Sequence, residues 1–236
     1  MELNKIYLGD CMELIKEIPD KSIDLIVTDP PYDIGTSHGS GIYRGKTNTH
    51  LEQLEKLNIN KGFDYNLLKE LVRVMKKINI YIYCNKKQVP IYLKFFEALK
   101  TSYDFLLWEK ENPAPMCGTH YLVDKEYCLY FWEAGAPVHI PYERGKTIYR
   151  SKTNVADKEI YKHPTIKNIE MVETLILNSS QPGGGYIRSV HRFRNHRPSR
   201  EKPRAAIYRV RNKSRILQNR LRSPEWYRCE RTTQFI

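Results

Sequence analysis

The sequence of 236 residues lacks the features that are typical of secreted and membrane proteins. Its five cysteines form no C-x-x-C pair, so neither a disulfide framework nor a paired-cysteine metal or redox site is indicated. No apolar run reaches about 18 residues, the length that spans a membrane, and nothing resembles a signal peptide. These absences predict a cytoplasmic protein with free thiols and no membrane partner. The length suits one domain with a sizeable core.

Acidic residues are scarce in the last quarter of the chain. Residues 183–236 contain 15 Lys and Arg but only 3 Glu and no Asp, so this segment accounts for the whole formal charge of +12. Residues 1–182 carry 24 basic and 24 acidic side chains, a net charge of zero. A basic nucleic-acid-binding protein is expected to carry its charge on the folded body. The basic tail therefore needs an explanation of its own.

The stretch 23–32 organises the rest of the chain. Its run Ile-Asp-Leu-Ile-Val-Thr is nearly continuous in apolar and β-branched residues, which is typical of a buried parallel strand. The run is followed by Asp29, Pro30, Pro31 and Tyr32. Because proline donates no ladder hydrogen bond, the strand must end where the prolines begin. Asp29 and Tyr32 are therefore predicted at the carboxyl end of the strand, the edge where open α/β sheets bind ligands.

Strand and helix patterns alternate along the rest of the body. Strands are predicted at 4–10, 23–28, 78–84, 103–108 and 126–131, and helices at 11–18, 63–77, 89–99 and 169–177. This alternation predicts a doubly wound α/β sheet. Residues 33–62 read as a polar loop with a helical patch at 51–57. Residues 132–162 are polar and irregular, with aromatic residues between cationic ones.

Asp29-Pro30-Pro31-Tyr32 resembles motif IV, (D/N/S)PP(Y/F/W), of the amino-methyltransferases that use S-adenosylmethionine. The order of the following motifs resembles the β-arranged DNA members of that family. A strand ending in Cys-Asn is followed by Trp-x-Lys-x-Asn and then by Glu-Tyr-x-Leu. The segment 163–168, His-Pro-Thr-Ile-Lys-Asn, is similar to the family's motif X, His-Pro-Thr-Gln-Lys-Pro, from which Ile166 and Asn168 depart.

The resemblance implies a Rossmann-like methyltransferase sheet with S-adenosyl-L-methionine as cofactor and no metal. It implies double-stranded DNA as substrate and a cognate restriction endonuclease as a partner. Asp29 and the Pro30 carbonyl would accept the two N–H bonds of the target amino group, beside Pro31. Tyr32 would stack on a base swung out of the helix. Asp at the first position of motif IV leans toward adenine N6. Cytosine N4 stays the alternative within the class, and an RNA or protein substrate is a further option.

The resemblance also implies cofactor-binding residues at both ends of the domain. Asp10 follows Gly9 and matches an Asp that contacts the adenine amino group of the cofactor. In motif X, the residues around the methionine end of the cofactor are His163, Thr165 and Lys167. From the residues alone, Asp10 can equally be a helix N-cap.

Residues that contact DNA are implied at three places. Trp108, Lys110 and Asn112 would form part of the wall around the flipped base. Tyr43 and Arg44, in the loop after motif IV, would contact DNA phosphate. The segment at about 132–162 would be a short target-recognition region. A solvated loop is the alternative for both loop segments.

The resemblance ends after Gly183. The family continues with a strand and Asp-Pro-Phe-x-Gly-Ser-Gly-Thr, motif I, whose glycines let the backbone approach the cofactor. A later strand ends in an acidic residue that binds the ribose hydroxyls. Residues 184–236 contain neither. Read one nucleotide later, within the Gly185 codon, residues 185–197 can encode Asp-Ile-Phe-Asp-Pro-Phe-Ile-Gly-Ser-Gly-Thr-Thr-Gly. Residues 207–213 can then encode Tyr-Ile-Gly-Phe-Glu-Ile-Asn.

Recovery of both motifs, in order and at the family's spacing, predicts that residues 184–236 are an out-of-frame translation of a methyltransferase gene. We therefore predict a methyltransferase domain over 1–183 and a poorly ordered basic tail over 184–236. The sheet is expected to be incomplete, because the two strands of the motif I region would be absent, and the chain is expected to be inactive or nearly so. Two alternatives remain: a non-catalytic remnant, for example of a phage or defective prophage, and a basic nucleic-acid-binding protein.

Overall fold

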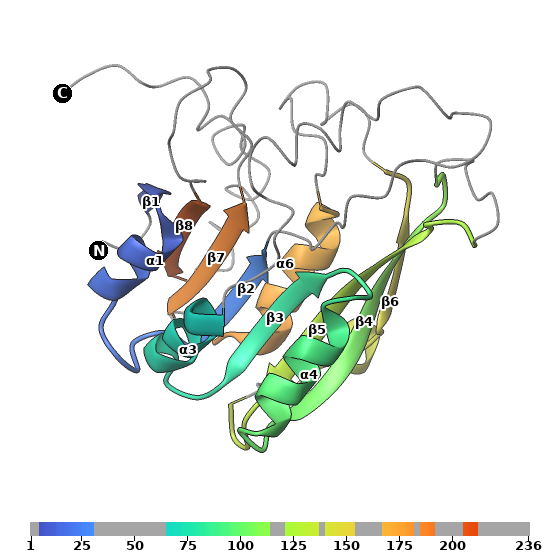
Figure 1. The fold of residues 1–236 in the computed structure, drawn as a ribbon. Coiled ribbons are helices and arrows are strands. Elements are labelled where there is room, and N and C mark those ends of the chain that lie inside the picture. The colour runs from blue at the N-terminus through green and yellow to red at the C-terminus, as the bar shows by residue number, and fades with distance from the viewer. Residues whose placement is uncertain are drawn as a thin grey trace, which may run out of the picture.

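The computed structural model describes residues 5–30, 65–113, 121–136, 140–153, 167–181, 185–191 and 205–211. Its strands are β1 (Lys5–Gly9), β2 (Leu25–Asp29), β3 (Asn79–Cys84), β4 (Ser102–Lys110), β5 (Lys125–Trp132), β6 (Ile148–Ser151), β7 (Gly185–His191) and β8 (Ala205–Arg211). Its helices are α1 (Cys11–Leu14), α3 (Tyr65–Val74), α4 (Val89–Glu97) and α6 (Ile169–Ser179), with 3-10 turns η1 (Ile15–Glu17) and η3 (Tyr142–Arg144). The strands form one sheet in the order β1-β8-β7-β2-β3-β5-β4-β6 (Figure 1).

The middle of this sheet is parallel and buried on both faces. β2 pairs in parallel with β3 on one side and with β7 on the other. Leu25, Ile26 and Val27 are all buried, because successive side chains point to opposite faces and each face is covered by helices. The buried parallel strand that was predicted from its continuous apolar run is confirmed.

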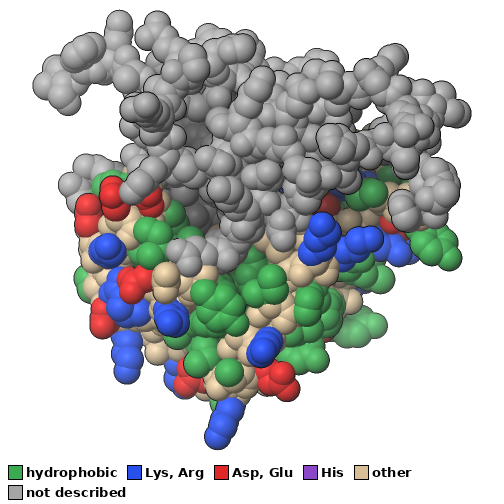
Figure 2. Space-filling model, in the orientation of Figure 1, with side chains coloured by type: hydrophobic (Ala, Val, Ile, Leu, Met, Phe, Trp, Pro, Cys, Tyr) green, Lys and Arg blue, Asp and Glu red, His purple; other side chains and the backbone are tan. Residues whose placement is uncertain are grey.

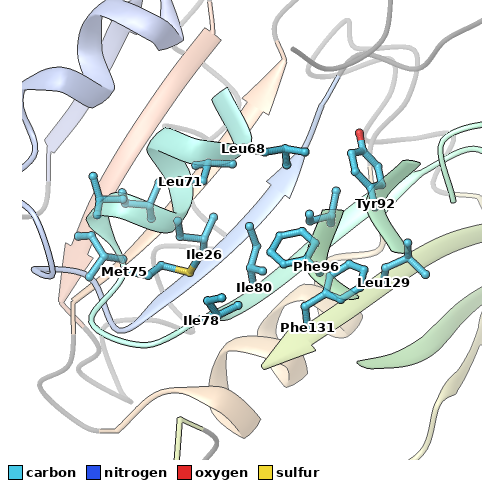
Figure 3. Packing of buried hydrophobic residues seen from close by; sticks show 14 of the residues in the cluster. Ile26, Leu68, Leu71, Met75, Ile78, Ile80, Tyr92, Phe96, Leu129 and Phe131 are labelled. Atoms are coloured by element: carbon cyan, nitrogen blue, oxygen red, sulfur yellow. The ribbon is translucent and has the colours of Figure 1, made fainter. Parts of the chain in front are cut away.

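One face of the sheet is covered by α1, α3 and α4 (Figure 1). The apolar positions of α3 recur at helical spacing, and Leu68, Leu71 and Val74 are buried. Pro90 lies in the first turn of α4, where a missing backbone N–H costs nothing. Figure 3 shows how the side chains of both helices pack on this face with residues of three strands: Ile26, Ile80, Leu129 and Phe131.

The other face is covered by α6, which lies behind the sheet in Figure 1. This helix buries Met171, Val172, Leu175 and Ile176 in a second apolar cluster. The strand side chains of that cluster alternate with those of the first, since Leu25 and Val27 belong to it whereas Ile26 does not. Helices on both faces of a central parallel sheet agree with the predicted Rossmann-like architecture.

The sheet is nevertheless mixed rather than parallel throughout. β5 runs antiparallel to both β3 and β4, and β8 runs antiparallel to both β7 and β1. β6 pairs in parallel with the last residues of β4, within the segment that was predicted to be irregular. β6 has only four residues, two of them exposed, so it carries no apolar run that the sequence pattern would reveal.

The expectation that the sheet lacks two strands in its C-terminal part is wrong. Residues 185–191 occupy the position beside β2, and residues 205–211 pair with them. The Gly185 amide donates to Asp24 Oδ2 at 2.8 Å, and the Asp24 amide donates to the Gly185 carbonyl at 2.8 Å. Ile187 is fully buried in the first cluster. The remainder of 184–236 lies outside the described residues, so the poor order of the tail as a whole stays a prediction.

The described part of the surface carries charges of both signs. Figure 2 shows Lys and Arg side chains interspersed with Asp and Glu around hydrophobic ones on the face of Figure 1. This mixture agrees with the balanced charge of residues 1–182. In the ranges that the structure describes, no helix is both long and apolar enough to cross a membrane.

Candidate active site

The candidate site lies at one edge of the sheet, where several strand ends come together. β2, β3 and β4 end at this edge, because β5 is antiparallel to both of its neighbours. Asp29 is the last residue of β2 and Lys110 the last of β4, whereas Glu126 lies near the start of β5. Lys167 does not belong to a strand and lies two residues before the start of α6. Four charged side chains from distant parts of the sequence are thereby collected.

These four residues, Asp29, Lys110, Glu126 and Lys167, form what we call the charged cluster. The Lys167 Nζ atom lies 2.6 Å from Glu126 Oε2 and 3.2 Å from Asp29 Oδ1. It also lies 5.1 Å from the centre of the Tyr83 ring, a cation–π contact. The other oxygen of Glu126, Oε1, lies 2.8 Å from Lys110 Nζ. Glu126 therefore bridges two lysines, and Lys167 bridges two carboxylates.

Burial makes the interactions in this cluster strong. The side chain of Lys167 is 5% exposed, and those of Asp29 and Glu126 are 15% and 16% exposed. Burial alone would raise the pKa of Glu126, but the positive charges of Lys167 and then Lys110 outweigh it and hold that pKa at about 2. Burial would likewise lower the pKa of Lys167, but Asp29 and Glu126 raise it. Glu126 and Lys167 are thus both charged at neutral pH and compensate each other.

The N-terminus of α6 fixes Lys167 in this position. Asn168 is the N-cap of the helix, and its Oδ1 accepts from the Met171 amide at 3.0 Å. Its Nδ2 donates to Ser151 Oγ at 2.7 Å, which links the helix to the end of β6. Asn168 is one of the two departures from the family motif, and it stabilises the helix start directly.

Trp108 and Asn112 join β4 to β6. Trp108 is buried, and its Nε1 donates to Ser151 Oγ at 2.9 Å. Asn112 Oδ1 accepts from the backbone amide of Thr153 at 2.6 Å and from its Oγ1 at 3.1 Å. Both side chains therefore lie near the site edge and hold its outer strand in place. Their predicted role in the wall of a base pocket, like that of Lys110, stays a prediction.

Asp10 also reaches the same edge, at the end of β1. Its Oδ1 accepts from the Met12 amide at 2.8 Å, so the N-cap interpretation is confirmed. β8 and β7 lie between β1 and β2, so the axes of β1 and β2 are three strand spacings, about 14 Å, apart. Its contact with a cofactor stays a prediction.

The remaining predicted site residues are partly beyond what the structure describes. Pro30 directly follows β2 and is described. The predicted residues outside the described ranges are Pro31, Tyr32, Tyr43, Arg44, His163 and Thr165. Conversely, the sequence analysis did not select Glu126 as a site residue. A charged residue at the start of the buried strand β5 was the available signal, because a buried charge requires a partner.

The fold is that of the α/β methyltransferases. Over 75% of this chain, the fold is similar to the structure of the M1.HpyAVI–SAM complex, with a TM-score of 0.50 at 21% identity and 78% of that chain covered. It is similar, over the same share, to the cytosine-N4-specific PvuII DNA methyltransferase, with a TM-score of 0.51 at 14% identity and 71% of that chain covered. At these identities the likeness shows the fold alone.

Residues 23–187 match the N6_N4_Mtase family, described as DNA methylase, and the chain belongs to this family. It is 27% identical to the type II methyltransferase M.HinfI of Haemophilus influenzae over 207 residues, which cover 76% of this chain and 56% of that protein. It is 25% identical to the DNA adenine methyltransferase YhdJ of Escherichia coli over 213 residues, which cover 77% of this chain and 69% of that protein. A stretch of 32 residues, 14% of this chain, is 62% identical to 9% of M.BglII of Bacillus subtilis. The chain thus spans about half of M.HinfI and a smaller share of M.BglII.

Proposed function

We propose that the intact form of this protein is a DNA methyltransferase that transfers a methyl group from S-adenosyl-L-methionine to the N6 amino group of adenine. We propose further that this chain is an out-of-frame product of its gene. The observation that carries the first proposal is the position of Asp29: a carboxylate at the end of the central strand, followed by Pro30 and balanced by a buried lysine.

The chemistry requires an acceptor at this position. The lone pair of an exocyclic amino group is delocalised into the base, which makes the nitrogen a poor nucleophile. A carboxylate and a carbonyl that accept its two N–H bonds favour a more tetrahedral and more reactive nitrogen. Asp29 and the Pro30 carbonyl are the groups for this task, and their contribution is positioning and electrostatic stabilisation. The Lys167 ammonium, 3.2 Å from Asp29 Oδ1, compensates the negative charge of this carboxylate.

The cofactor supplies its methyl group from a positively charged sulfonium. The residues of this chain do not fit it. β7 occupies the motif I strand position, yet it carries Arg188 and Ser189 where the family has an acidic residue and proline. Arginines follow where the family has its glycines, at positions 192, 194 and 197. A glycine lets the backbone approach a ligand closely and an arginine does not, so we assign cofactor binding to the frame-repaired protein only.

Three observations support the frame hypothesis. The family match ends at residue 187, beside the predicted break. β7 and β8 overlap the two stretches that decode in the shifted frame as the motif I strand and the later strand. The break falls on three consecutive glycines, Gly183, Gly184 and Gly185. Every glycine codon begins with two guanines, so one extra nucleotide in this run accounts for the change of frame.

The test compares three proteins in a methyl-transfer assay with labelled S-adenosylmethionine and unmethylated DNA. We expect no transfer by this chain, robust transfer after one nucleotide is removed at the codons of Gly183–Tyr186, and loss of transfer when the repaired protein carries Asp29→Ala. Full activity of this chain would refute the frame hypothesis. Activity of the repaired D29A variant equal to that of the unsubstituted repaired protein would refute the role of Asp29.

The same assay identifies the target base. The Asp of motif IV and the similarity to YhdJ support adenine N6, whereas the fold is also similar to that of a cytosine-N4-specific enzyme. Chromatography of nucleosides from the methylated DNA separates N6-methyladenine from N4-methylcytosine. The type II methyltransferases among the relatives support a cytoplasmic restriction-modification context with a cognate endonuclease. If the repaired protein methylates nothing, a non-catalytic remnant becomes the better explanation.

A further inference from the structure

Glu126 opens the Glu-Tyr-x-Leu stretch but was not selected as a site residue from the sequence, yet it organises the charged cluster. Both of its oxygens are engaged, Oε2 by Lys167 at 2.6 Å and Oε1 by Lys110 at 2.8 Å. The side chain is 16% exposed, so the full cost of removing a carboxylate from water must be offset by these contacts. A carboxylate kept charged at such a place calls for a function.

The distances show which carboxylate holds Lys167 more tightly. Lys167 Nζ makes a hydrogen bond of 2.6 Å to Glu126, whereas its ion pair with Asp29 is 3.2 Å long. The ring of Tyr83, a residue of β3, also contacts the ammonium, with its centre 5.1 Å from Lys167 Nζ. The ammonium is therefore shared unequally, with the shorter contact away from the residue that the proposed chemistry uses.

This unequal sharing matters for an acceptor. A cation in direct contact with a carboxylate lowers its electron density and competes with any other donor that approaches it. A cation held slightly farther away still compensates the negative charge but weakens the acceptor less. The position of Lys167 thus tunes Asp29, and the contact with Glu126 sets that position.

We propose that Glu126 is a positioning residue that holds the Lys167 ammonium back from Asp29 and so keeps Asp29 a strong acceptor for the target amino group. The catalytic part of this inference rests on the proposed function. Lys110 pairs with the other oxygen of Glu126, so that the bridging carboxylate is held by two cations. Without Glu126, Lys167 would shift fully onto Asp29.

A merely structural role for Glu126 makes different predictions. If Glu126 only stabilised the fold, its loss would lower the melting temperature and leave the environment of Asp29 unchanged. If it positions Lys167, its loss changes the Asp29 carboxylate and the rate of transfer in a protein that remains folded. Glu70 on α3 serves as the matched control. It forms an ion pair of 2.8 Å with Arg73 and does not belong to the charged cluster.

The first experiment uses this chain as it exists and requires no activity. NMR of carboxyl carbons is recorded for the unsubstituted chain and for Glu126→Gln, Glu70→Gln and Lys167→Met. We expect the Asp29 carboxyl resonance to move in E126Q and to stay in place in E70Q. We also expect the pKa of Glu126, about 2 in the unsubstituted chain, to rise toward that of an ordinary glutamate in K167M. An Asp29 resonance that is the same in E126Q and E70Q would overturn the inference.

The second experiment measures kcat and KM in the frame-repaired protein. For E126Q we expect kcat to fall roughly ten- to a hundredfold with KM for DNA within about twofold, because the lost interaction acts on the transition state. Glu126→Asp, which keeps the charge, should recover part of the rate, and E70Q should match the unsubstituted protein. A kcat of E126Q equal to that of E70Q would overturn the inference.

The two experiments separate the inference from the proposed function. If the repaired protein transfers no methyl group while the Asp29 resonance moves only in E126Q, the proposed function fails and the hold of Glu126 on Lys167 stands. If the repaired protein is active and the resonance does not move, the proposed function stands and the inference fails.

Discussion

β2 and β7 lie side by side at the centre of the sheet and pair in parallel over five residues, yet they differ in almost everything else. β2 is almost continuously apolar, ends in an acidic residue and is followed by two prolines. β7 reads Gly-Tyr-Ile-Arg-Ser-Val-His and ends in none of the residues that the chemistry requires. The difference teaches that a place in a sheet and a role in a site are specified separately.

The place of β7 depends on few interactions. Backbone pairing is independent of side-chain identity, Asp24 fixes the first residue at Gly185, and Ile187 fills the core. The role that we propose for β2 depends instead on Asp29 and on a charged cluster whose other members come from β4, β5 and the residues just before α6. A shift of frame can by chance preserve the ability of a strand to pair in the sheet. It can hardly preserve a set of charged side chains that must meet at one site.

Truncation of one core side chain on each strand tests whether β7 is packed as firmly as β2. Ile26 and Ile187 are both fully buried in the same apolar cluster. We expect Ile26→Ala and Ile187→Ala each to lower the free energy of unfolding by about 2–5 kcal/mol, because each leaves a cavity. Chemical denaturation of the two variants measures this. An unchanged stability of I187A would show that β7 contributes no packing, whatever the result for I26A.

Acid should loosen the charged cluster at the end of β2. The pKa of Glu126 is held at about 2 in the folded protein, below its ordinary value of 4.5. Its ionisation therefore stabilises the fold fully above about pH 4.5, and this contribution, about 3 kcal/mol at most, is lost as the pH falls toward 2. Denaturation at pH 6, 4 and 2.5 measures the decline. In Glu126→Gln this part of the pH dependence should disappear, and an unchanged slope would contradict the assignment.

The smallest expected effect concerns the contact that places β7 beside β2. Asp24→Ala removes the acceptor for the Gly185 amide, together with the exposed ion pair to Lys76, and should cost about 1.5–3 kcal/mol, the range for a hydrogen bond to a charged group. Asp104→Ala is the matched control, because Asp104 is exposed on β4 and, within the described residues, accepts a hydrogen bond only from the adjacent Phe105 amide. It should change stability by less than about 0.5 kcal/mol. Equal stability of the two variants would contradict the role of Asp24.

Much of the body of the fold was predictable because its segments carry strong local patterns. The predicted helix at 89–99 is observed as α4, Val89–Glu97, and the one at 169–177 as α6, Ile169–Ser179. The strand predicted at 78–84 is β3, Asn79–Cys84. In each case apolar spacing and the flanking polar residues define the element, and these signals lie within a dozen residues.

The rest depends on partners that are distant in the sequence. The antiparallel direction of β5 leaves no local signal, because an apolar strand looks the same in either direction. β7 was missed since Arg188 and Ser189 interrupt its apolar run, and its pairing with β2 comes from residues 161 positions apart. Asp29 was predicted from its motif, whereas Glu126 was not, because its partner Lys167 lies 41 residues further along the chain.

The occupied place beside β2 has a consequence for the fate of this chain as the out-of-frame product that we propose. An open strand at the centre of the molecule would expose a row of N–H and C=O groups to other chains, the usual starting point of edge-to-edge aggregation. β7 covers this row. We therefore expect such a protein to accumulate as a monodisperse species rather than as inclusion bodies, so that loss of catalysis need not entail loss of the protein itself.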